Sequence, residues 1–438
     1  MTENLSEGSA KKLILTDFYH QPTKRFLASL TAAGIPYKHV NINYDGFMPN
    51  EILNPFAHLI GAQGMPDKDL HYNQVKVPEY DEIRNLDGGK AEILRGDNLV
   101  GYIYYAPNTW RLVREVVWLS RSAVPTIAYR YNRQGFKYAE VLYDFEGKEV
   151  KVLYYNAEGK QVLTVDAASR VMLGENQVFQ NLTDFVKDYL SRLLDGVDEI
   201  LINSMSTPFF VANQMPKIKS SLYFQEVIHK EIPGNMQQIL AGKSALKRIL
   251  FENSKEMAKV QRLSSENFVR LEYLGAIEQF ARENEFRPAA LTVTRSDQIL
   301  YDEAIAKTLA ENHIKWTIAA PSEISDKLRT FANHHKNVNV LEAISSKNLP
   351  KLLADNDIYL DLNQGGDWEN SVQRAYLEGM LVITDMKVIK NAGYELILEK
   401  EQEIIDVLNR PDKDRALRVL REKKGKPATA ADYKRLLC

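Results

Sequence analysis

The stretch from Asp357 to Gln373 holds the residues whose types and spacing come closest to a ligand-binding site. It reads Asp-Ile-Tyr-Leu-Asp-Leu-Asn-Gln-Gly-Gly-Asp-Trp-Glu-Asn-Ser-Val-Gln. We expect a buried strand to end at Asn363, glycines to follow it, and a helix to start near Ser371. Ligands of open α/β sheets bind at the carboxyl ends of strands, and the amides of a helix start can hold a phosphate. The pattern predicts a pocket with the candidate residues Arg295, Asn363, Trp368, Glu369, Asn370 and Ser371.

Simpler interpretations of these residues stay open. A strand-to-helix loop that is capped by Asn370 or Ser371 has the same sequence. Arg295 follows a predicted strand, where an arginine is more typical of a surface ion pair than of a phosphate contact. Asp355 and Asp357 have the spacing of a metal site, but helix capping explains the pair as well. We therefore expect neither a metal nor a cofactor.

The loop after the first predicted strand argues against catalysis. Leu13–Thr16 is expected to be a strand and Pro22–Ala33 a helix, with Asp-Phe-Tyr-His-Gln between them. In two-domain nucleotide-sugar enzymes this junction usually contains glycine, which lets the backbone approach a ligand. Here bulky rings crowd the junction. His20 is a candidate base, but no Ser or Cys nucleophile is recognisably paired with it, so we expect no catalytic residues.

The elements that carry these loops alternate between strand and helix. Such alternation builds parallel sheets with helices on both faces, and it predicts an α/β protein with two Rossmann-like domains. We expect Met236–Arg262 to be mostly helical and Glu401–Cys438 to form a charged surface helix. In the second half we expect the strands Ala290–Thr294, Lys315–Ala319, Val338–Leu341, Asp357–Leu362 and Met380–Thr384, with the helices Tyr301–Glu311, Glu323–Phe331, Leu349–Ala354 and Ser371–Gly379 between them.

Three glycines interrupt this alternation at intervals of twelve residues, at positions 135, 147 and 159. Each sits in a similar polar phrase, and strand-length runs rich in Tyr, Val and Leu separate the phrases. Glycine supplies the positive φ that tight turns need, so the pattern predicts consecutive β-hairpins. The hairpins form an antiparallel β-meander that is inserted in the first Rossmann-like domain.

The meander carries aromatic or aliphatic residues on both of its predicted faces. Side chains alternate along a strand, which places Val141, Tyr143 and Phe145 on one face and Tyr138 and Leu142 on the other. Packing on the protein's own domains is one explanation. We favour contact with another chain, because exposed aromatic area marks interaction sites. The candidate partner-binding residues are Tyr138, Tyr143, Phe145, Tyr154 and Tyr155.

Domain boundaries follow from these patterns. Residues 1–75 and 176–275 are expected to form the N-terminal Rossmann-like domain, and residues 76–175 the inserted β-meander. Residues 276–400 are expected to form the C-terminal Rossmann-like domain, and residues 401–438 a charged helical tail.

Composition limits the class of protein. The chain has 438 residues with a formal net charge of −2, which gives no electrostatic case for binding nucleic acid. Its single cysteine is Cys438, and no apolar run approaches the roughly 18 residues of a membrane-spanning helix. We expect a cytoplasmic protein. The basic run Lys423, Lys424 and Lys426 allows peripheral contact with anionic lipid as an alternative to a solvated terminus.

Several phrases resemble one family, the GtfB-type stabilising subunit of the O-GlcNAc transferase that modifies serine-rich-repeat adhesins in the accessory Sec system. Their order along the chain, from about residue 13 to residue 390, matches the order in that family. The matching phrases are Asp17-Phe-Tyr, Ser29-Leu-Thr-Ala-Ala-Gly34, Tyr44-Asp-Gly-Phe-Met-Pro49, Asn54-Pro-Phe56, Tyr131-Asn-Arg-Gln-Gly135, Ile232-Pro-Gly-Asn-Met236, Thr294-Arg-Ser-Asp-Gln-Ile299, Ile318-Ala-Ala-Pro-Ser-Glu-Ile-Ser325 and Asp357-Ile-Tyr-Leu-Asp-Leu-Asn363.

The resemblance implies a GT-B-like architecture without transferase activity of its own. Such a subunit binds a catalytic GtfA-type glycosyltransferase through the β-domains, stabilises it, and helps it to hold the serine-rich polypeptide acceptor that receives GlcNAc or a related sugar. The predicted pocket would then hold acceptor or a residual sugar. Arg295 stands where that family phrase has Asn. Two alternatives are an active retaining GT-B glycosyltransferase that uses a UDP-sugar in Asn363–Ser371, and a scaffold that never touches acceptor.

Overall fold

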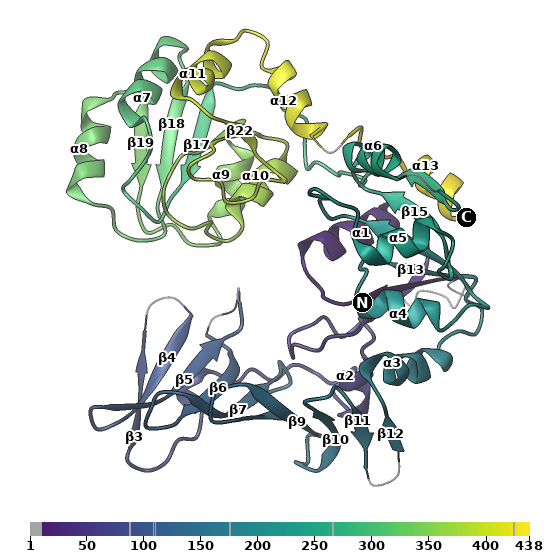
Figure 1. Ribbon diagram of the computed structural model, residues 1–438. Helices are drawn as coiled ribbons and strands as arrows, with labels where there is room; N and C mark the ends of the chain where they lie inside the picture. Colours follow the sequence, from purple (N-terminus) through teal and green to yellow (C-terminus); the bar gives the residue numbers. More distant parts are fainter. Residues whose placement is uncertain are drawn as a thin grey trace. The chain divides into compact units, whose positions relative to one another are not determined.

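The computed structural model describes residues 11–86, 89–107, 109, 111–174, 177–264, 267–423 and 425–438. Lys424, part of the predicted basic run, lies outside this set. The chain divides into two compact units, and Figure 1 labels many of their elements. Unit 1 comprises the chain up to Leu274 together with Ala430–Cys438, and unit 2 comprises Gly275–Thr429.

Unit 1 contains a six-stranded parallel sheet in the order β16-β15-β14-β13-β1-β2. Its central strands are almost wholly buried, as expected of a parallel sheet that helices cover on both faces. The strands are β1 (Lys12–Thr16), β2 (Tyr37–Asn41), β13 (Glu199–Ile202), β14 (Lys219–Phe224), β15 (Leu246–Phe251) and β16 (Arg270–Tyr273). The helices are α1 (Gln21–Ala32), α2 (Pro55–Leu59), α3 (Leu182–Ser191), α4 (Thr207–Asn213), α5 (Gly234–Leu240), α6 (Ser254–Leu263) and α13 (Ala430–Leu437), with the 3₁₀ turn η1 (Tyr72–Gln74).

The prediction that Met236–Arg262 is mostly helical is wrong in its middle. The strand β15 separates α5 from α6, and it pairs in parallel with β14 and β16. Its last four residues are all buried. Three of them, Ile249, Leu250 and Phe251, are apolar, and the fourth is Arg248. A short apolar run of this length suits a buried strand and a buried helix alike, so periodicity alone does not distinguish them.

The inserted part of unit 1 is an antiparallel sheet of ten strands that follow one another in chain order from β3 to β12. The predicted β-meander is confirmed. Gly135, Gly147 and Gly159 all have φ near +80° and sit in the turns that join β7 to β8, β8 to β9 and β9 to β10. The strands are β3 (Asp81–Asn85), β4 (Lys90–Arg95), β5 (Asn98–Tyr105), β6 (Val113–Leu119), β7 (Pro125–Tyr131), β8 (Lys137–Tyr143), β9 (Glu149–Tyr155), β10 (Gln161–Asp166), β11 (Val171–Leu173) and β12 (Gln177–Phe179).

The segment Tyr44–Asn50 joins the six-stranded sheet to the first of these hairpins. The ring of Tyr44 meets the ring of Tyr138 edge-on at 4.8 Å, and the carbonyl oxygen of Gly46 accepts the amide of Arg133 at 2.9 Å. Gly46 has φ +81°, and a Cβ atom placed there would lie 2.7 Å from the carbonyl oxygen of Tyr131. The backbones approach so closely that only glycine fits at this position.

A second contact lies on the neighbouring strand of the meander. Asn54 caps α2 by accepting the amides of Phe56 and Ala57 at 2.8 and 2.9 Å. The capped turn holds the Phe56 ring stacked on Tyr154 of β9, with the ring centroids 4.9 Å apart. Leu163 and Val171 of the meander are buried in the same core cluster as Phe56. The inner part of the ten-stranded sheet is therefore packed onto the Rossmann-like part of unit 1.

Unit 2 contains a second six-stranded parallel sheet, in the order β19-β18-β17-β20-β21-β22. Together with the first sheet and the inserted meander, it confirms the predicted α/β class. The strands are β17 (Ala289–Val293), β18 (Lys315–Ala319), β19 (Val338–Leu341), β20 (Ile358–Asp361), β21 (Leu381–Asp385) and β22 (Leu396–Leu398). The helices are α7 (Asp302–Glu311), α8 (Asp326–His334), α9 (Leu349–Ala354), α10 (Ser371–Glu378), α11 (Glu401–Asn409) and α12 (Asp414–Arg421).

The segment 401–438 is not one surface helix. It forms α11, α12 and α13, and each of them buries apolar side chains. Tyr433 of α13 is fully buried in unit 1, with its hydroxyl 3.4 Å from that of Tyr223. The charged residues lie on the outer faces of these amphipathic helices. The prediction of one surface helix relied on the high charge and overlooked the apolar faces. No helix within the described ranges is long and apolar enough to span a membrane.

We predict that Gly46→Ala destabilises unit 1 more than Gly61→Ala. Both glycines have positive φ, +81° and +71°, but no atom lies within 4 Å of a Cβ at Gly61. Gly61→Ala should cost about 1–2 kcal/mol through backbone strain alone. Gly46→Ala should cost about 1–3 kcal/mol more, because its methyl group meets backbone atoms. Urea denaturation of both variants measures the difference, and equal losses would show that the close approach at Gly46 is not rigid.

Candidate functional site

The structure brings Arg295 and Asn363 to the same edge of the unit 2 sheet, where β17 and β20 end. The two loops pair through backbone hydrogen bonds, including Leu300 N to Leu362 O at 2.9 Å. Asn363 is buried: its amide nitrogen donates to Val293 O, and its side-chain oxygen accepts the Gly365 amide at 3.1 Å. Arg295 is exposed. Asn363 therefore shapes the loop from inside, while Arg295 is free to meet a ligand.

The start of α10 is already bound by a carboxylate of this chain. Asp367 accepts the amide of Val372 at 3.3 Å and the hydroxyl of Ser371 at 2.8 Å. Asn370 occupies the N-cap position, as one alternative from the sequence has it, but its side chain makes no cap hydrogen bond and Asp367 accepts the helix amide instead. The buried Ser371 hydroxyl also lies 2.8 Å from the hydroxyl of Tyr359. A phosphate at this helix start would have to displace Asp367.

Glu369 and Asn370 precede α10 in the left-handed conformation, with φ of +55° and +53°. Both side chains are exposed, and Trp368 beside them packs half-buried against the core of unit 2. Left-handed non-glycine residues cost of order 1–3 kcal/mol each and cluster at binding sites. This short strained turn is the strongest sign of a ligand contact among the predicted pocket residues.

Asp357, which with Asp355 has the spacing of a metal site, belongs to a buried ion-pair network instead. Arg287 donates to its carboxylate at 2.6 and 2.9 Å, and Arg282 lies 2.8 Å from it. Hydrogen bonds from Arg287 lower the pKa of Asp357 against the opposing effect of burial. Within the described ranges, no group of three or more His, Cys, Asp or Glu side chains is arranged to hold a metal.

The carboxyl edge of the unit 1 sheet is likewise occupied by the chain itself. Asp17, at the end of β1, accepts hydrogen bonds from the hydroxyls of Ser204 and Ser206, with Ser204 at 2.8 Å. His20 lies 3.0 Å from the hydroxyl of Thr23. Sequence reasoning missed the two serines, because nearly two hundred residues separate them from Asp17 and no local spacing signals the contact.

The candidate partner-binding residues fall into different environments. Tyr138 is 2% exposed, and a register shift in β7 next to Tyr131 turns its ring toward Tyr44. Tyr154 is half-buried against Phe56. Tyr143 and Tyr155 are half-buried within the sheet, and Phe145 is 89% exposed in the turn after β8. Tyr138 and Tyr154 therefore hold the sheet in place, which leaves three candidates accessible.

The two faces of the ten-stranded sheet are covered differently. One face packs under the segment 70–77, with Val75 buried against Ile93, Ile103 and Val116. The other face carries a small cluster of Val117, Ala128 and Val141. All of the apolar residues described as packing against this cluster come from the sheet itself: Tyr104, Leu119, Tyr143 and Val152. We call this set the open face. Tyr104 and Leu119 were not among the predicted residues, although strand alternation from Val117 would have indicated them.

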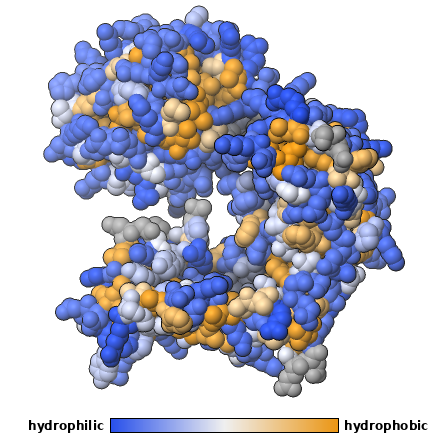
Figure 2. Space-filling model, in the orientation of Figure 1, coloured by the Kyte–Doolittle hydropathy of each residue, from blue (hydrophilic) through white to orange (hydrophobic). Residues whose placement is uncertain are grey.

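Tyr155 lies on the opposite, covered face. Its hydroxyl donates to Glu140 at 2.9 Å, and the ammonium of Lys137 lies over its ring at 4.9 Å. The same ammonium lies 4.8 Å from the centroid of Tyr129, which packs against the covered cluster. Figure 2 shows apolar side chains interspersed with polar ones over the strands of this sheet. Tyr143 and Tyr155 thus lie on opposite faces of the same sheet.

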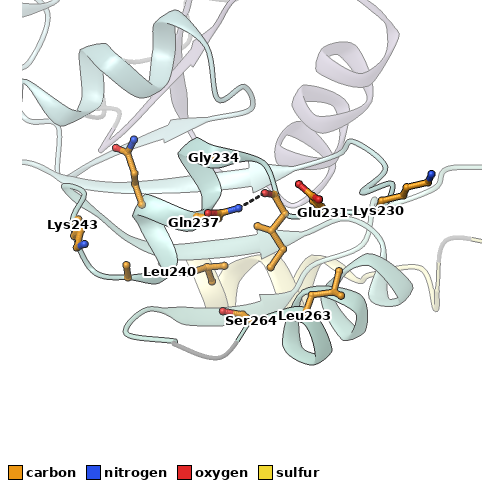
Figure 3. A pocket seen from close by; sticks show the side chains of 11 residues that line it. Lys230, Glu231, Gly234, Gln237, Leu240, Lys243, Leu263 and Ser264 are labelled. Carbon is orange, nitrogen blue, oxygen red and sulfur yellow. Dashed lines mark hydrogen bonds between the residues drawn. The ribbon is translucent and has the colours of Figure 1, made fainter.

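A cleft of about 710 Å³ opens beside α5 in unit 1. In Figure 3, Lys230 and Lys243 lie at its opposite ends, with Leu240, Leu263 and Ser264 between them. The side-chain amide of Gln237 donates to Ile232 O at 2.7 Å across its wall. None of the residues predicted from the sequence lines this cleft, so it is separate from both candidate sites.

The basic run near the carboxyl terminus is partly used inside unit 2. Lys423 donates to the carbonyl oxygens of Ala392 and Glu395 at 2.7 and 3.1 Å. Its charge is therefore directed at a loop of this chain, which weakens the case for lipid contact by this residue.

Comparison with protein families gives four consecutive matches. The GtfB N-terminal domain family matches residues 14–59, the GtfB middle domain 81–182 and the GtfB third domain 182–263. The GftB/GlyA-F C-terminal domain family matches residues 290–410. The middle-domain match falls on the ten-stranded sheet.

Curated relatives cover most of the chain. The chain is 30% identical over 390 residues to the UDP-N-acetylglucosamine–peptide N-acetylglucosaminyltransferase stabilizing protein GtfB of Streptococcus pneumoniae serotype 4, covering 87% of this chain and 86% of that protein. It is 29% identical over 393 residues to the protein of the same name from Streptococcus gordonii, covering 87% and 86%.

Solved structures agree in fold. One chain of a structure described as a GtfA/B complex bound to UDP and GlcNAc matches with a TM-score of 0.87 at 26% identity, over 97% of this chain and 99% of that one. TarM matches with a TM-score of 0.51 at 12% identity, covering 98% of both chains, which shows fold alone.

We predict that Tyr154→Ala destabilises unit 1 and that Phe145→Ala does not. Tyr154 stacks on Phe56 where the ten-stranded sheet packs on the Rossmann-like part of unit 1, a contact that we call the joint. The loss of its side chain should cost about 2–4 kcal/mol. Phe145 is 89% exposed, and its loss should change the free energy of unfolding by less than about 0.5 kcal/mol. Urea denaturation tests both. A similar small effect for the two variants would mean that Tyr154 does not hold the joint.

Proposed function

The chain belongs to the GtfB family of glycosyltransferase-stabilizing proteins, and on that basis we propose that it is the non-catalytic subunit of a protein O-GlcNAc transferase. In this role it binds a catalytic GtfA-type subunit and a serine-rich polypeptide acceptor. The observation that carries the proposal is the 30% identity to a GtfB stabilizing protein over 87% of the chain. We also propose that three of the regions expected from the sequence are its functional modules: residues 1–75 with 176–275, residues 76–175, and residues 276–400.

The open face of the ten-stranded sheet is the proposed contact with the catalytic subunit. Its buried centre is Val117, Ala128 and Val141, and Tyr104 and Tyr143 flank it. The described apolar neighbours of this cluster belong to the sheet. Aromatic side chains around an apolar centre are typical of the energetically dominant part of an interface.

The edge of unit 2 is the proposed contact with acceptor. Arg295, Glu369 and Asn370 are exposed there, whereas Asn363 and Ser371 are buried and shape the loops. Arginine, carboxylate and amide groups can hydrogen-bond to serine hydroxyls and to peptide groups. A net charge of −2 places no strong field on the protein, which suits an acceptor that carries little charge.

The absence of catalysis by this chain is a proposal that rests on occupied binding positions. A glycosyltransferase must leave the carboxyl edges of its sheets free for donor and acceptor. Here Asp17 is bound by Ser204 and Ser206, and the start of α10 is bound by Asp367. These internal hydrogen bonds would have to break before a substrate could enter.

We predict that Tyr143→Ala combined with Phe145→Ala weakens association with a GtfA-type subunit at least about tenfold, because each accessible aromatic residue at an interface centre contributes on the order of 1–2 kcal/mol. Tyr155→Ala is the matched control, since it removes the same side chain from the covered face of the same sheet. Affinity is measured by titration of the purified subunits. A larger loss for the control than for the double variant would place the interface on the other face.

We predict that the purified chain transfers no sugar from UDP-GlcNAc to a serine-rich peptide, and that addition of a GtfA-type subunit produces transfer. Mass spectrometry of the peptide measures the products. Efficient transfer by the chain alone would instead support the retaining glycosyltransferase, and loss of that activity in Glu369→Ala would locate it. Transfer by the pair with no binding of the peptide to this chain would favour a scaffold that leaves the acceptor to its partner.

A further inference from the structure

The segment from Met386 to Glu395 crosses from the end of β21 to the start of β22 without a helix of its own. The two strands are parallel neighbours, so the segment has to travel back along the sheet. We call it the strap. Its first residues are exposed, including Met386 and Ile389, whereas Tyr394 and Glu395 at its end are buried.

Lys390, in the middle of the strap, reaches the end of β20. Its ammonium forms an ion pair with Asp361 Oδ1 and donates to the carbonyl oxygen of Asn363 at 3.0 Å. The Lys390 side chain is 10% exposed and that of Asp361 is 1% exposed. This cation lies at the strand end where an α/β fold offers its ligand position. Asn363 belongs to the pocket that the sequence predicts, so the strap binds directly to that pocket's wall.

Glu395 is the second carboxyl group that acts on Asp361. Asp361 Oδ2 is buried with no N–H or O–H donor among the described residues. A hydrogen bond with the Glu395 carboxyl is one of the causes that raise the pKa of Asp361, after burial and against the opposing effect of Lys390. Two carboxyl groups in such contact need a proton between them. Two carboxyl groups that hold one proton between them carry a charge of −1, which the ammonium of Lys390 balances.

Glu395 also fixes the strap to itself. It is fully buried and accepts the backbone amide of Asn391 at 2.8 Å. Lys423 donates to its carbonyl oxygen at 3.1 Å. Of the other charged groups nearby, Asp385 is turned away toward Tyr301, whose hydroxyl donates to it at 2.9 Å. Tyr359, on β20, is held neutral because burial raises its pKa well above the usual value.

We propose that the strap is a closed lid on the carboxyl edge of the unit 2 sheet, and that Lys390, Asp361 and Glu395 are its latch. The chain thus supplies its own cation to the position that a ligand would otherwise take. The latch lies outside the ten-stranded sheet and does not depend on the partner. It deepens the proposed lack of catalysis, because a donor sugar cannot reach Asn363 while Lys390 is bound there.

Hydrogen exchange of the strap amides in the whole chain tests the latch at neutral pH. Lys390→Met should raise the opening equilibrium of residues 386–395 at least about tenfold, because two buried carboxyl groups lose their cation. Lys387→Met is the matched control: this neighbouring lysine is exposed and donates to the hydroxyl of Tyr301 at 3.0 Å. Unchanged exchange in Lys390→Met, or equal loosening in both variants, would overturn the proposal.

The shared proton predicts a pH dependence with a definite sign. The pKa of Asp361 is raised to about 8 in the closed state, whereas a solvated aspartate has a pKa near 4. The closed strap therefore binds one proton more than the open strap between about pH 4 and pH 8, and closure weakens as pH rises through that window. The opening equilibrium, corrected for intrinsic exchange, should rise by up to about tenfold per pH unit.

Asp361→Asn keeps the size of the side chain and removes the shared proton. This variant should stay closed at neutral pH, because Lys390 keeps its hydrogen bond to the Asn363 carbonyl oxygen and Glu395 keeps that of the Asn391 amide. Its opening equilibrium, corrected for intrinsic exchange, should not depend on pH. A pH slope like that of the unsubstituted chain would show that another group titrates. A strap that opens in Asp361→Asn as much as in Lys390→Met would overturn the latch. Neither result depends on transfer activity, so the proposal can fail while the proposed function stands.

Discussion

The contact between Gly46 and the Tyr131–Tyr138 hairpin is the constraint on which the rest of unit 1 depends. A Cβ at Gly46 would meet the Tyr131 carbonyl oxygen at 2.7 Å, so the two backbones touch with no side chain between them. The rings of Tyr44 and Tyr138 and the Phe56–Tyr154 stack then extend this contact along the sheet. Because β8 and β9 are held this way, the accessible Tyr143 and Phe145 can be presented without the sheet detaching from the Rossmann-like core.

In both parallel sheets, polar groups at the carboxyl edge are bound by other residues of the chain. Asp17 accepts hydrogen bonds from two serine hydroxyls, Asp367 accepts an amide at the start of α10, and Asp361 forms an ion pair with Lys390. Buried polar groups require partners, and a site that supplies them internally gives up the free positions that catalysis needs. The ten-stranded sheet shows the reverse, since the described apolar neighbours of its outer cluster come only from the sheet. The Rossmann-like units thus satisfy these polar groups with partners from the same chain. On the meander, Tyr143 and Phe145 stay accessible.

Much of this arrangement follows from local sequence, and the failures have three separate causes. The turns at Gly135, Gly147 and Gly159 follow from the need for positive φ, and the second parallel sheet from strand–helix alternation. The strand β15 is too short for periodicity to separate it from a helix. Tyr138 changes face because the register shifts beside Tyr131, and one extra residue reverses a period of two. At the sites, Ser204 with Asp17 and Lys390 with Asp361 are joined only by tertiary contact.

A subunit that stabilises another protein must itself remain folded while presenting apolar surface. The aromatic joint meets this requirement, because Tyr138 and Tyr154 are used for internal packing and Tyr143 is not part of that contact. The five tyrosine and phenylalanine candidates are therefore not equivalent. Substitution of a joint residue would lower partner binding by unfolding the sheet, whereas substitution on the open face would lower it directly. Only a stability measurement on the isolated chain separates these two causes, and that separation decides which residues form the interface.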